Sequence, residues 1–445
     1  MKRYDSYKDS GIDWIGEIPE DWNIKRIKHT TYVKGRIGWQ GLKSEEFREV
    51  SDSIVVTGTD FKSGKIDWTS AYQIPIDRYN EDPFIQLKEN DLLITKDGTI
   101  GKVAIVKNMP KIATLNSGVF VVRPNTEDYI PEFMFWILNS EVFSSFYNYN
   151  KSGSTIQHLY QNVFNEFKFT CPPIFEQQLI SKFLDAKTFE IETLIQKKKQ
   201  LIALLKEERT AIINHAVTKG INPKVNLKDS GVEWIGEIPE HWTYVSLKRL
   251  VKVKDGTHDT PEYVDNNSQS FPFITTKDIV QNSVSFEKCK YISKEDFMNI
   301  NKRSDVKKGD IIMPMIGTVG SPIVVETSRE FSIKNLALIK SSKFLDMYFL
   351  KYFFECRIIN DQLKLLTSGG VQNFISLGDL RNIKIPKMSI IEQVNITNYL
   401  NNKTFEICSI ISKTEKEINL MQEYKTALIS EAVTGKIDVR EAVLN

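Results

Sequence analysis

The chain has 445 residues, more than one hydrophobic core usually organises, and its 41% hydrophobic and 26% charged residues are typical of a folded globular protein. Its 59 lysines and arginines nearly balance 57 aspartates and glutamates, so net charge does not indicate nucleic acid and any DNA-binding surface has to be local. Four scattered cysteines disfavour a disulfide framework or a zinc site, and the absence of a signal peptide or an apolar stretch of about 20 residues predicts a cytoplasmic protein without a membrane partner.

The first element along the chain is the phrase KDSGIDWIGEIPEDW at residues 8–22, which returns as KDSGVEWIGEIPEHW at 228–242. Twelve of the fifteen positions are identical, so the chain contains an internal repeat. Further segments match in the same order: VVTGTDF at 55–61 with FITTKDI at 273–279, LKENDLLITKDGTIGKVAIV at 87–106 with VKKGDIIMPMIGTVGSPIVV at 306–325, and SGSTIQHL at 152–159 with SGGVQNFI at 368–375.

After each phrase come short apolar runs bounded by Asp-Gly, Gly and Pro, which predict strands joined by turns. The run LLITKDGTIGKVAIV, for example, has a GTxG turn between two apolar segments. A helical pattern follows at 131–147. Each globular part is therefore predicted to be α+β.

Two long segments without Gly or Pro follow, at 177–217 and 390–434, and both predict long amphipathic helices of roughly 60 Å. Positions seven residues apart form an apolar stripe, so we expect the helices to pair as an antiparallel coiled coil. Lys198 and Thr414 would interrupt this seam with polar side chains. The alternative is two separate helices, each on its own globule. The predicted seam residues are Leu184, Ile191, Leu205, Ile212, Leu400, Ile407, Met421 and Leu428.

The fold predicted from these elements is a pseudo-two-fold repeat, with two similar α+β domains separated by two long antiparallel helices in a dumbbell arrangement. The expected divisions are a first globular domain at 1–171, a first helical region at 172–223, a second globular domain at 224–386, and a second helical region with the C-terminal tail at 387–445.

Two similar but non-identical heads suit a ligand with a dyad, such as double-stranded DNA, whose paired half-sites lie about 34 Å apart. The GTxG turns differ at their tips. The first copy carries Lys96, Asp97 and Lys102, whereas the second has Met315, Ile316 and Ser321. One frame with different tips is what two readers of different base sequences need.

The paired KDSG…WIGEIPE…W phrases, the GT-x-G hairpins and the two EQ…KTFEI…AVT helices resemble the DNA-specificity subunit of type I restriction-modification enzymes. The stretch DGTHDTPEYV at 255–264 is similar to target recognition domains of that family. The resemblance covers roughly residues 5–440.

This resemblance implies two target recognition domains that each read half of a split DNA site. It also implies helical regions that set the spacing and dock two modification (methyltransferase) subunits, with restriction (motor-nuclease) subunits joining the full complex. The chain would be a non-catalytic subunit that binds no cofactor, while partners hold S-adenosylmethionine, ATP and Mg.

Base readout requires donors and acceptors on loops. The predicted DNA-binding residues of the first domain are Lys34, Arg36, Gln40, Thr57, Thr59, Lys96, Thr99, Lys102, Lys151, Ser154, Thr155 and Gln157. Those of the second domain are His258, Thr260, Thr275, Thr276, Lys277, Thr318, Ser368, Gln372 and Asn373. For any one of them, a solvated side chain or an internal turn hydrogen bond is an equally good interpretation.

The motifs of catalytic sites are incomplete in this sequence, which argues against an enzyme. The string EDPF at 81–84 lacks one proline of an adenine-methyltransferase loop, and GTIGKV at 98–103 lacks the spacing of a phosphate-binding loop. The five histidines offer neither a triad nor metal-ligand spacing. Two alternatives stay open: a specificity subunit of a methylation-only system, and a two-headed protein-binding scaffold.

Overall fold

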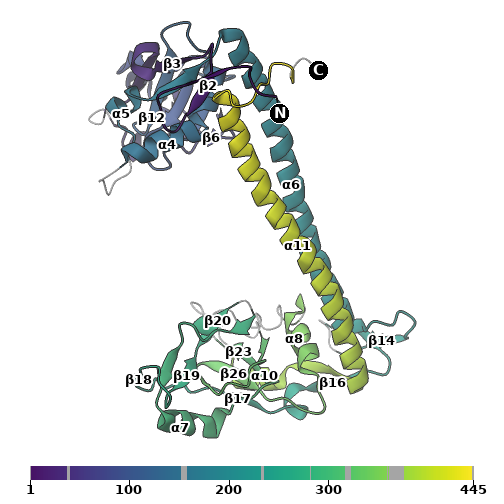
Figure 1. Cartoon of the computed structure of the whole chain (residues 1–445). Coiled ribbons are helices and arrows are strands. Elements are labelled where there is room, and N and C mark those ends of the chain that lie inside the picture. The colour runs from purple at the N-terminus through teal and green to yellow at the C-terminus, as the bar shows by residue number, and fades with distance from the viewer. Residues whose placement is uncertain are drawn as a thin grey trace. The chain divides into compact units, whose positions relative to one another are not determined.

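The computed structural model describes residues 2–37, 41–151, 158–231, 235–280, 282–315, 322–357, 359 and 375–442. These residues form two compact units, one built from 1–198 together with 416–445 and the other from 199–415. Each long helix contributes to both units, so the compact units cut across the four divisions expected from the sequence (Figure 1).

The first unit contains a six-stranded sheet in the order β4-β12-β9-β10-β7-β6 and a three-stranded sheet in the order β11-β5-β8. The GTxG segment forms the predicted hairpin, because β9 and β10 pair antiparallel on either side of it. The strands are β1 (Tyr7–Asp9), β2 (Glu17–Pro19), β3 (Asn23–Arg26), β4 (Thr31–Gly35), β5 (Ser53–Val56), β6 (Phe61–Lys62), β7 (Lys65–Ile66), β8 (Gln73–Ile74), β9 (Leu92–Thr95), β10 (Val103–Ile105), β11 (Ala113–Leu115), β12 (Val119–Pro124) and β13 (Lys168–Cys171).

Helices of this unit pack against the larger sheet, because buried residues of both share one core. The helical segment predicted at 131–147 forms two helices, because Ser140 begins a new one by accepting a hydrogen bond from Val142 N at 3.2 Å. The short helices are α1 (Ile27–Thr30), α2 (Ile76–Asn80), α3 (Pro131–Leu138), α4 (Glu141–Asn150) and α5 (Gln161–Asn165).

The second unit repeats this plan. Its sheets run β17-β26-β23-β24 and β18-β22-β19-β25, and in both units the second sheet contains one parallel pair, β5 with β11 and β19 with β25. Its elements are β14 (Leu227–Asp229), β15 (Glu237–Pro239), β16 (Thr243–Ser246), β17 (Val253–Asp255), β18 (Tyr263–Val264), β19 (Phe271–Ile274), β20 (Ile279–Val280), β21 (Ser283–Val284), β22 (Lys290–Ile292), α7 (Lys294–Ser304), β23 (Ile311–Pro314), β24 (Ile323–Val324), β25 (Ser332–Ile333), β26 (Leu336–Ile339), α8 (Met347–Glu355), α10 (Leu377–Asn382) and β27 (Lys384–Lys387).

The two long helices are α6 (Ile174–Lys219) and α11 (Ile390–Val433). Less exposed residues recur along both at alternating steps of four and three, the spacing of a coiled-coil seam. Within the first unit the helices run antiparallel, since Glu192 pairs with Lys425 at 3.1 Å and Lys198 pairs with Glu417. The helices are therefore paired there, and the alternative of separate helices does not hold in this unit.

The repeated phrase fastens each globular part to helix ends. Trp22 Nε1 donates to Glu176 at 3.1 Å, and Trp242 Nε1 donates to Glu392 at 3.0 Å, so each phrase ends on the first turn of the helix that follows its own domain. The same tryptophans also lie against the glycine that ends the other helix.

Gly435 follows α11 with φ +74°, and Gly220 follows α6 with φ +75°. A Cβ at Gly435 would lie 3.1 Å from Trp22 and 2.4 Å from Pro19, while one at Gly220 would lie 3.4 Å from Trp242. Glycine meets both the backbone and the packing requirement. Each phrase thus joins the start of one helix to the end of the other.

Buried glutamines complete this joint. Gln177 Nε2 donates to the carbonyls of Pro172 and Asp128 at 2.8 Å, and Gln393 occupies the equivalent place in α11, where its Oε1 accepts from Asp346 N at 2.9 Å. The cores are correspondingly mixed: Leu428 and Val433 of α11 pack in the first unit. Each joint therefore holds helix ends against the globular part of its own unit.

Candidate nucleic-acid interface

In the first unit, loops that carry predicted DNA readers meet at one end of the six-stranded sheet. The end of β4 lies beside the start of β12, because Gly35 is paired with Phe120. Backbone hydrogen bonds of 2.9 Å join Lys96 N to Gly118 O and Leu159 N to Lys96 O. Asn116 N likewise donates to Val56 O at 2.9 Å. Five segments distant in sequence therefore form one polar edge, here called the first tip.

The β9–β10 turn is held by one buried hydroxyl. Thr95 Oγ1 donates to Thr99 O at 2.6 Å and accepts from Lys102 N at 2.9 Å. The side chains of Thr99 and Lys102 are exposed. Lys96 is half-buried instead, with its ammonium 4.9 Å from the centre of the Phe120 ring, and burial lowers the pKa of this lysine. Thus Lys102 is the freer cation of the turn.

A Thr-x-x-Asp turn occurs at the same place in both units. Thr57 Oγ1 donates to Asp60 at 2.9 Å, and Thr275 Oγ1 donates to Asp278 at 2.8 Å. Both carboxylates also accept from the backbone N–H of the same threonine, at 2.7 and 2.8 Å. The hydroxyls of Thr57 and Thr275 are therefore occupied by their own turns. Thr59, Thr276 and Lys277 beside them are exposed.

Arg36 corrects one prediction. It was expected to contact DNA, but it is only 1% exposed. Its Nε donates to Leu115 O at 2.8 Å and its Nη1 lies 3.5 Å from Glu81, so the guanidinium is used inside the domain. Burial is the main cause of its lowered pKa. Arg36 supports the first tip and is not available to a DNA groove.

The second unit has an equivalent edge, here called the second tip. His258 Nδ1 lies 2.9 Å from Asn335 Oδ1, and Lys334 Nζ donates to Thr260 Oγ1. Lys334 N also donates to Ile274 O at 2.9 Å, which joins this turn to the end of β19. His258 and Thr260 are thereby brought together, with Thr275 one residue beyond β19.

Two predicted readers stand apart from these networks. Lys34 is half-buried, with its ammonium 5.7 Å from the Phe84 ring centre, and Lys151 is exposed at the end of α4. The remaining predicted readers lie outside the described residues: Gln40, Ser154, Thr155, Gln157, Thr318, Ser368, Gln372 and Asn373.

The predicted seam residues lie on the less exposed faces of α6 and α11. Leu184, Leu400, Ile407 and Leu428 are buried, and Ile191, Leu205, Ile212 and Met421 are half-buried.

Sequence reasoning missed several residues at the tips. Asn116 lies at the first tip, and Asn335, Asp255 and Arg303 lie at the second. A signal was present for Asp255, because it precedes a glycine at the start of the DGTHDTPEYV stretch, whereas Asn335 lies outside the segments matched in the repeat. Arg303 gave no local signal, since it lies on α7 and reaches the tip only through folding.

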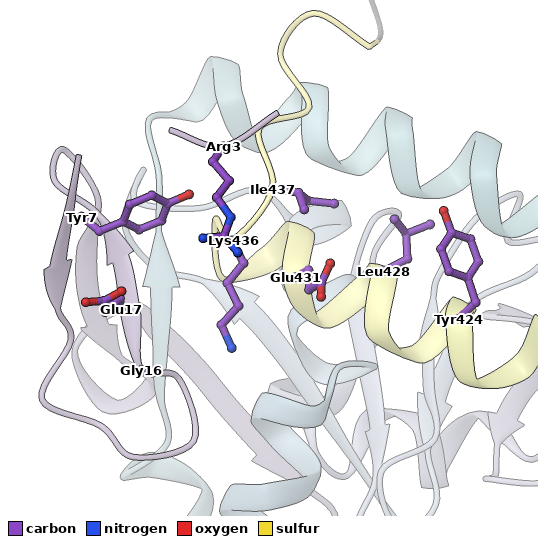
Figure 2. Close-up of a pocket in the computed structure, with 9 residues that line it drawn as sticks. All are labelled: Arg3, Tyr7, Gly16, Glu17, Tyr424, Leu428, Glu431, Lys436 and Ile437. Atoms are coloured by element: carbon purple, nitrogen blue, oxygen red, sulfur yellow. The ribbon is translucent and has the colours of Figure 1, made fainter. Parts of the chain in front are cut away.

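A pocket of about 730 Å³ lies in the first unit where the β1–β2 hairpin meets the end of α11. Figure 2 shows Arg3 and Lys436 in the middle of its lining, between Tyr7 of the hairpin and Glu431 of the helix. None of the predicted DNA-reading residues lines it. The pocket belongs to the joint between the phrase and the helix rather than to the first tip.

Within the described residues, no three His, Cys, Asp or Glu side chains are grouped as a metal site. The described helices include none that is both long and apolar enough to cross a membrane.

A family model described as the type I restriction modification DNA specificity domain matches this chain twice, over residues 19–203 and 239–420. The chain belongs to this family. Each matched segment contains most of one globular domain and much of the helix that follows it, so the internal repeat is a repeat of the specificity domain.

Relatives match this chain over nearly their whole length. The type I restriction enzyme MjaVIII specificity subunit of Methanocaldococcus jannaschii is 25% identical, with 95% of this chain and 94% of that protein covered. A chain from a structure of type I restriction-modification complex assembly gives a TM-score of 0.71 at 17% identity, covering 94% of this chain and 99% of that chain. The HsdS subunit from Thermoanaerobacter tengcongensis gives 0.58 at 16% identity, covering 94% and 98%. These structures share the fold of this specificity-domain protein.

Proposed function

We propose that this chain is the DNA-recognition subunit of a type I restriction-modification enzyme, in which each specificity domain reads one half of a split DNA site. The observation that carries the proposal is one frame built twice with different tips. The Thr-x-x-Asp turns and the Trp-to-Glu joints are the same in both copies, whereas the side chains at the tips differ.

Paired positions make that difference concrete. Phe120 of β12 and Ala337 of β26 take equivalent places opposite the ends of β9 and β23. The first tip therefore carries an aromatic ring with Lys96 above it, whereas the second has a small residue and the polar pair His258 and Asn335. Different hydrogen-bond donors on one scaffold favour different bases.

The long helices support a role in docking a partner that is present in two copies. Large apolar side chains stay exposed at equivalent positions of α6 and α11, led by Phe189 and Phe405 of the two KTFEI segments, which are 72% and 76% exposed. The other equivalent pairs are Phe175 with Ile391, Leu194 with Ile410, and Leu204 with Leu420. A surface repeated on both helices suits two modification subunits, and exposed apolar side chains of this size favour protein contacts.

The chemistry would then reside in partners. Modification subunits would hold S-adenosylmethionine, and restriction subunits would hold ATP and Mg, while this chain supplies the DNA sequence readout. We place the assembled complex in the cytoplasm, where its DNA substrate lies.

The test is to co-express the chain with its modification subunit and to map methylated adenines across the host genome. Cells with the modification subunit alone are the control. The expected result is one new split motif that depends on this chain. Absence of new methylation from a well-assembled complex would contradict the proposal, and it is the outcome expected for a protein-binding scaffold.

A further inference from the structure

A chain of polar contacts crosses the second tip from α7 to the turn between β25 and β26. Arg303 Nη2 donates to Asp255 Oδ1 and Oδ2 at 2.6 and 2.7 Å. Asp255 Oδ2 lies 3.2 Å from His258 Nε2, and His258 Nδ1 lies 2.9 Å from Asn335 Oδ1. Four side chains from three segments thus fix one another.

The backbone holds the two loops close enough for these contacts. A Cβ on Gly256 would lie 2.4 Å from Ile333 O, so only glycine permits this approach. Thr257 N donates to Ile333 O at 3.1 Å, and Asn335 N donates to Thr257 O at 3.2 Å. Backbone hydrogen bonds therefore fix the positions of Thr257 and Asn335 relative to each other, as they do between paired strands.

Asn335 occupies the outer end of this network and has φ +52°, a conformation that asparagine tolerates better than most residues. Its Oδ1 faces His258, and an amide oxygen has a second lone pair for another donor. Among the described residues, its Nδ2 has no acceptor. Whichever ring nitrogen of His258 carries the proton, the Asn335 amide keeps at least one N–H donor and one acceptor lone pair free, beside a histidine side chain that is 58% exposed.

We propose that Asn335 reads an adenine in the half-site bound by the second domain, and that Asp255, held by Arg303, positions it through His258. This inference rests on the proposed function. An asparagine amide forms a two-bond contact with adenine, accepting from N6 and donating to N7 in the major groove. A fixed amide makes that contact at a lower cost in side-chain entropy than a free one.

The first tip has a histidine pair of its own, because His158 Nδ1 contacts Asp97 Oδ1, but among its described residues no hydrogen bond joins His158 to an asparagine amide and no arginine pairs with Asp97. The residue that follows β4 there is Arg36, which is buried against Leu115 O and is not exposed beside an asparagine amide. Changes to the network of the second unit should therefore alter recognition of one half-site only, and the other half-site is an internal control.

The test uses Asn335→Gly, because glycine keeps the left-handed backbone and removes the amide. Asn282→Gly is the matched control, since Asn282 in the same unit also has a positive φ, of 60°. The full chain with its modification subunits is titrated with duplexes in which each base pair of the mapped site is replaced in turn. Asn335→Gly should lose about tenfold to a hundredfold of the discrimination at one A·T pair of the second half-site, and Asn282→Gly should lose none.

A duplex with 7-deazaadenine at that pair removes the N7 acceptor. This duplex should weaken binding of the wild-type complex and have no further effect on the complex that carries Asn335→Gly. Asp255→Asn should lower discrimination at the same pair, with no additional loss in the Asn335→Gly background.

Unchanged discrimination in Asn335→Gly, or equal weakening on every duplex, would overturn the base contact. Additive losses from Asp255→Asn and Asn335→Gly would overturn the positioning role. If the wild-type complex showed no preference for any split site, the proposed function itself would fail. This result is distinguishable from failure of the Asn335 contact, in which the wild-type complex still prefers a split site.

Discussion

At the scale of single residues, some polar side chains at the tips are used in hydrogen bonds within the domain, whereas others are free to contact a ligand. Thr57 and Thr275 bond to aspartates three residues on, and this turn is readable from the sequence in retrospect. Arg36 was not predictable in this way, since its partners Leu115 and Glu81 are distant along the chain. Sequence reasoning thus located the polar loops, but it could not tell which side chains fold inward.

Lys102 provides a direct test of the first tip. Lys102→Ala should weaken DNA binding and lower the salt dependence of affinity by about one unit in slope, because one phosphate contact is lost. Lys96→Ala should have a smaller effect on that slope, since Lys96 is half-buried over Phe120. Binding is measured over a range of salt concentrations.

Lys182→Ala, on an exposed position of α6, is the control for both lysine variants. If Lys102→Ala binds DNA with the original affinity and salt slope, the β9–β10 turn is not part of the interface.

The cysteines should react in a fixed order. Burial raises the pKa of the Cys171 thiol to about 11, so its reactive thiolate forms only in strongly alkaline solution. Cys408 is exposed. Iodoacetamide at pH 8 should therefore label Cys408 in the folded protein and leave Cys171 unmodified, as measured by peptide mass spectrometry.

Raising the pH towards about 11 should increase Cys171 labelling, if the protein stays folded, because the thiolate fraction then rises. Unfolding in denaturant should make both cysteines reactive at pH 8. Equal labelling of both in the folded protein at pH 8 would show that Cys171 is not buried.

At the scale of elements, the long helices were the most predictable part of the fold. Segments without Gly or Pro at 177–217 and 390–434 correspond closely to α6 and α11. The helices continue through the two polar seam positions because both side chains have partners. Lys198 pairs with Glu417, and Thr414 Oγ1 donates to Ile410 O of its own helix at 2.8 Å. Strand order was not predictable, because it depends on pairing between distant segments.

Seam and surface positions lie next to one another on these helices, which allows a matched comparison. Leu205→Asp with Met421→Asp places carboxylates at half-buried seam positions and should lower the thermal stability of the helix pairing and abolish recognition of the split site. Leu204→Asp with Leu420→Asp changes exposed neighbours and should leave thermal stability nearly unchanged. Circular dichroism and DNA binding are measured for both. Wild-type melting and site recognition in the seam variant would show that these residues do not hold the helices together.

At the scale of the whole molecule, the repeat predicts the number of partners. Phe189→Ser should remove one modification subunit from the complex, Phe405→Ser the other, and the double variant both, because each side chain is exposed on one of the two equivalent faces. Native mass spectrometry counts the subunits. Full occupancy in the double variant would move the docking surface elsewhere.

The division of the chain into units also has a consequence for its synthesis on the ribosome. The second unit is one continuous segment, 199–415, whereas the first needs residues 416–445, whose Leu428, Val433 and Val439 complete its core. The domain translated first is therefore the last to complete its fold. Part of its apolar core surface stays exposed until the C-terminal residues leave the ribosome. A stop codon just after residue 415 would spare every residue of the second unit and leave the oldest part of the nascent chain incomplete.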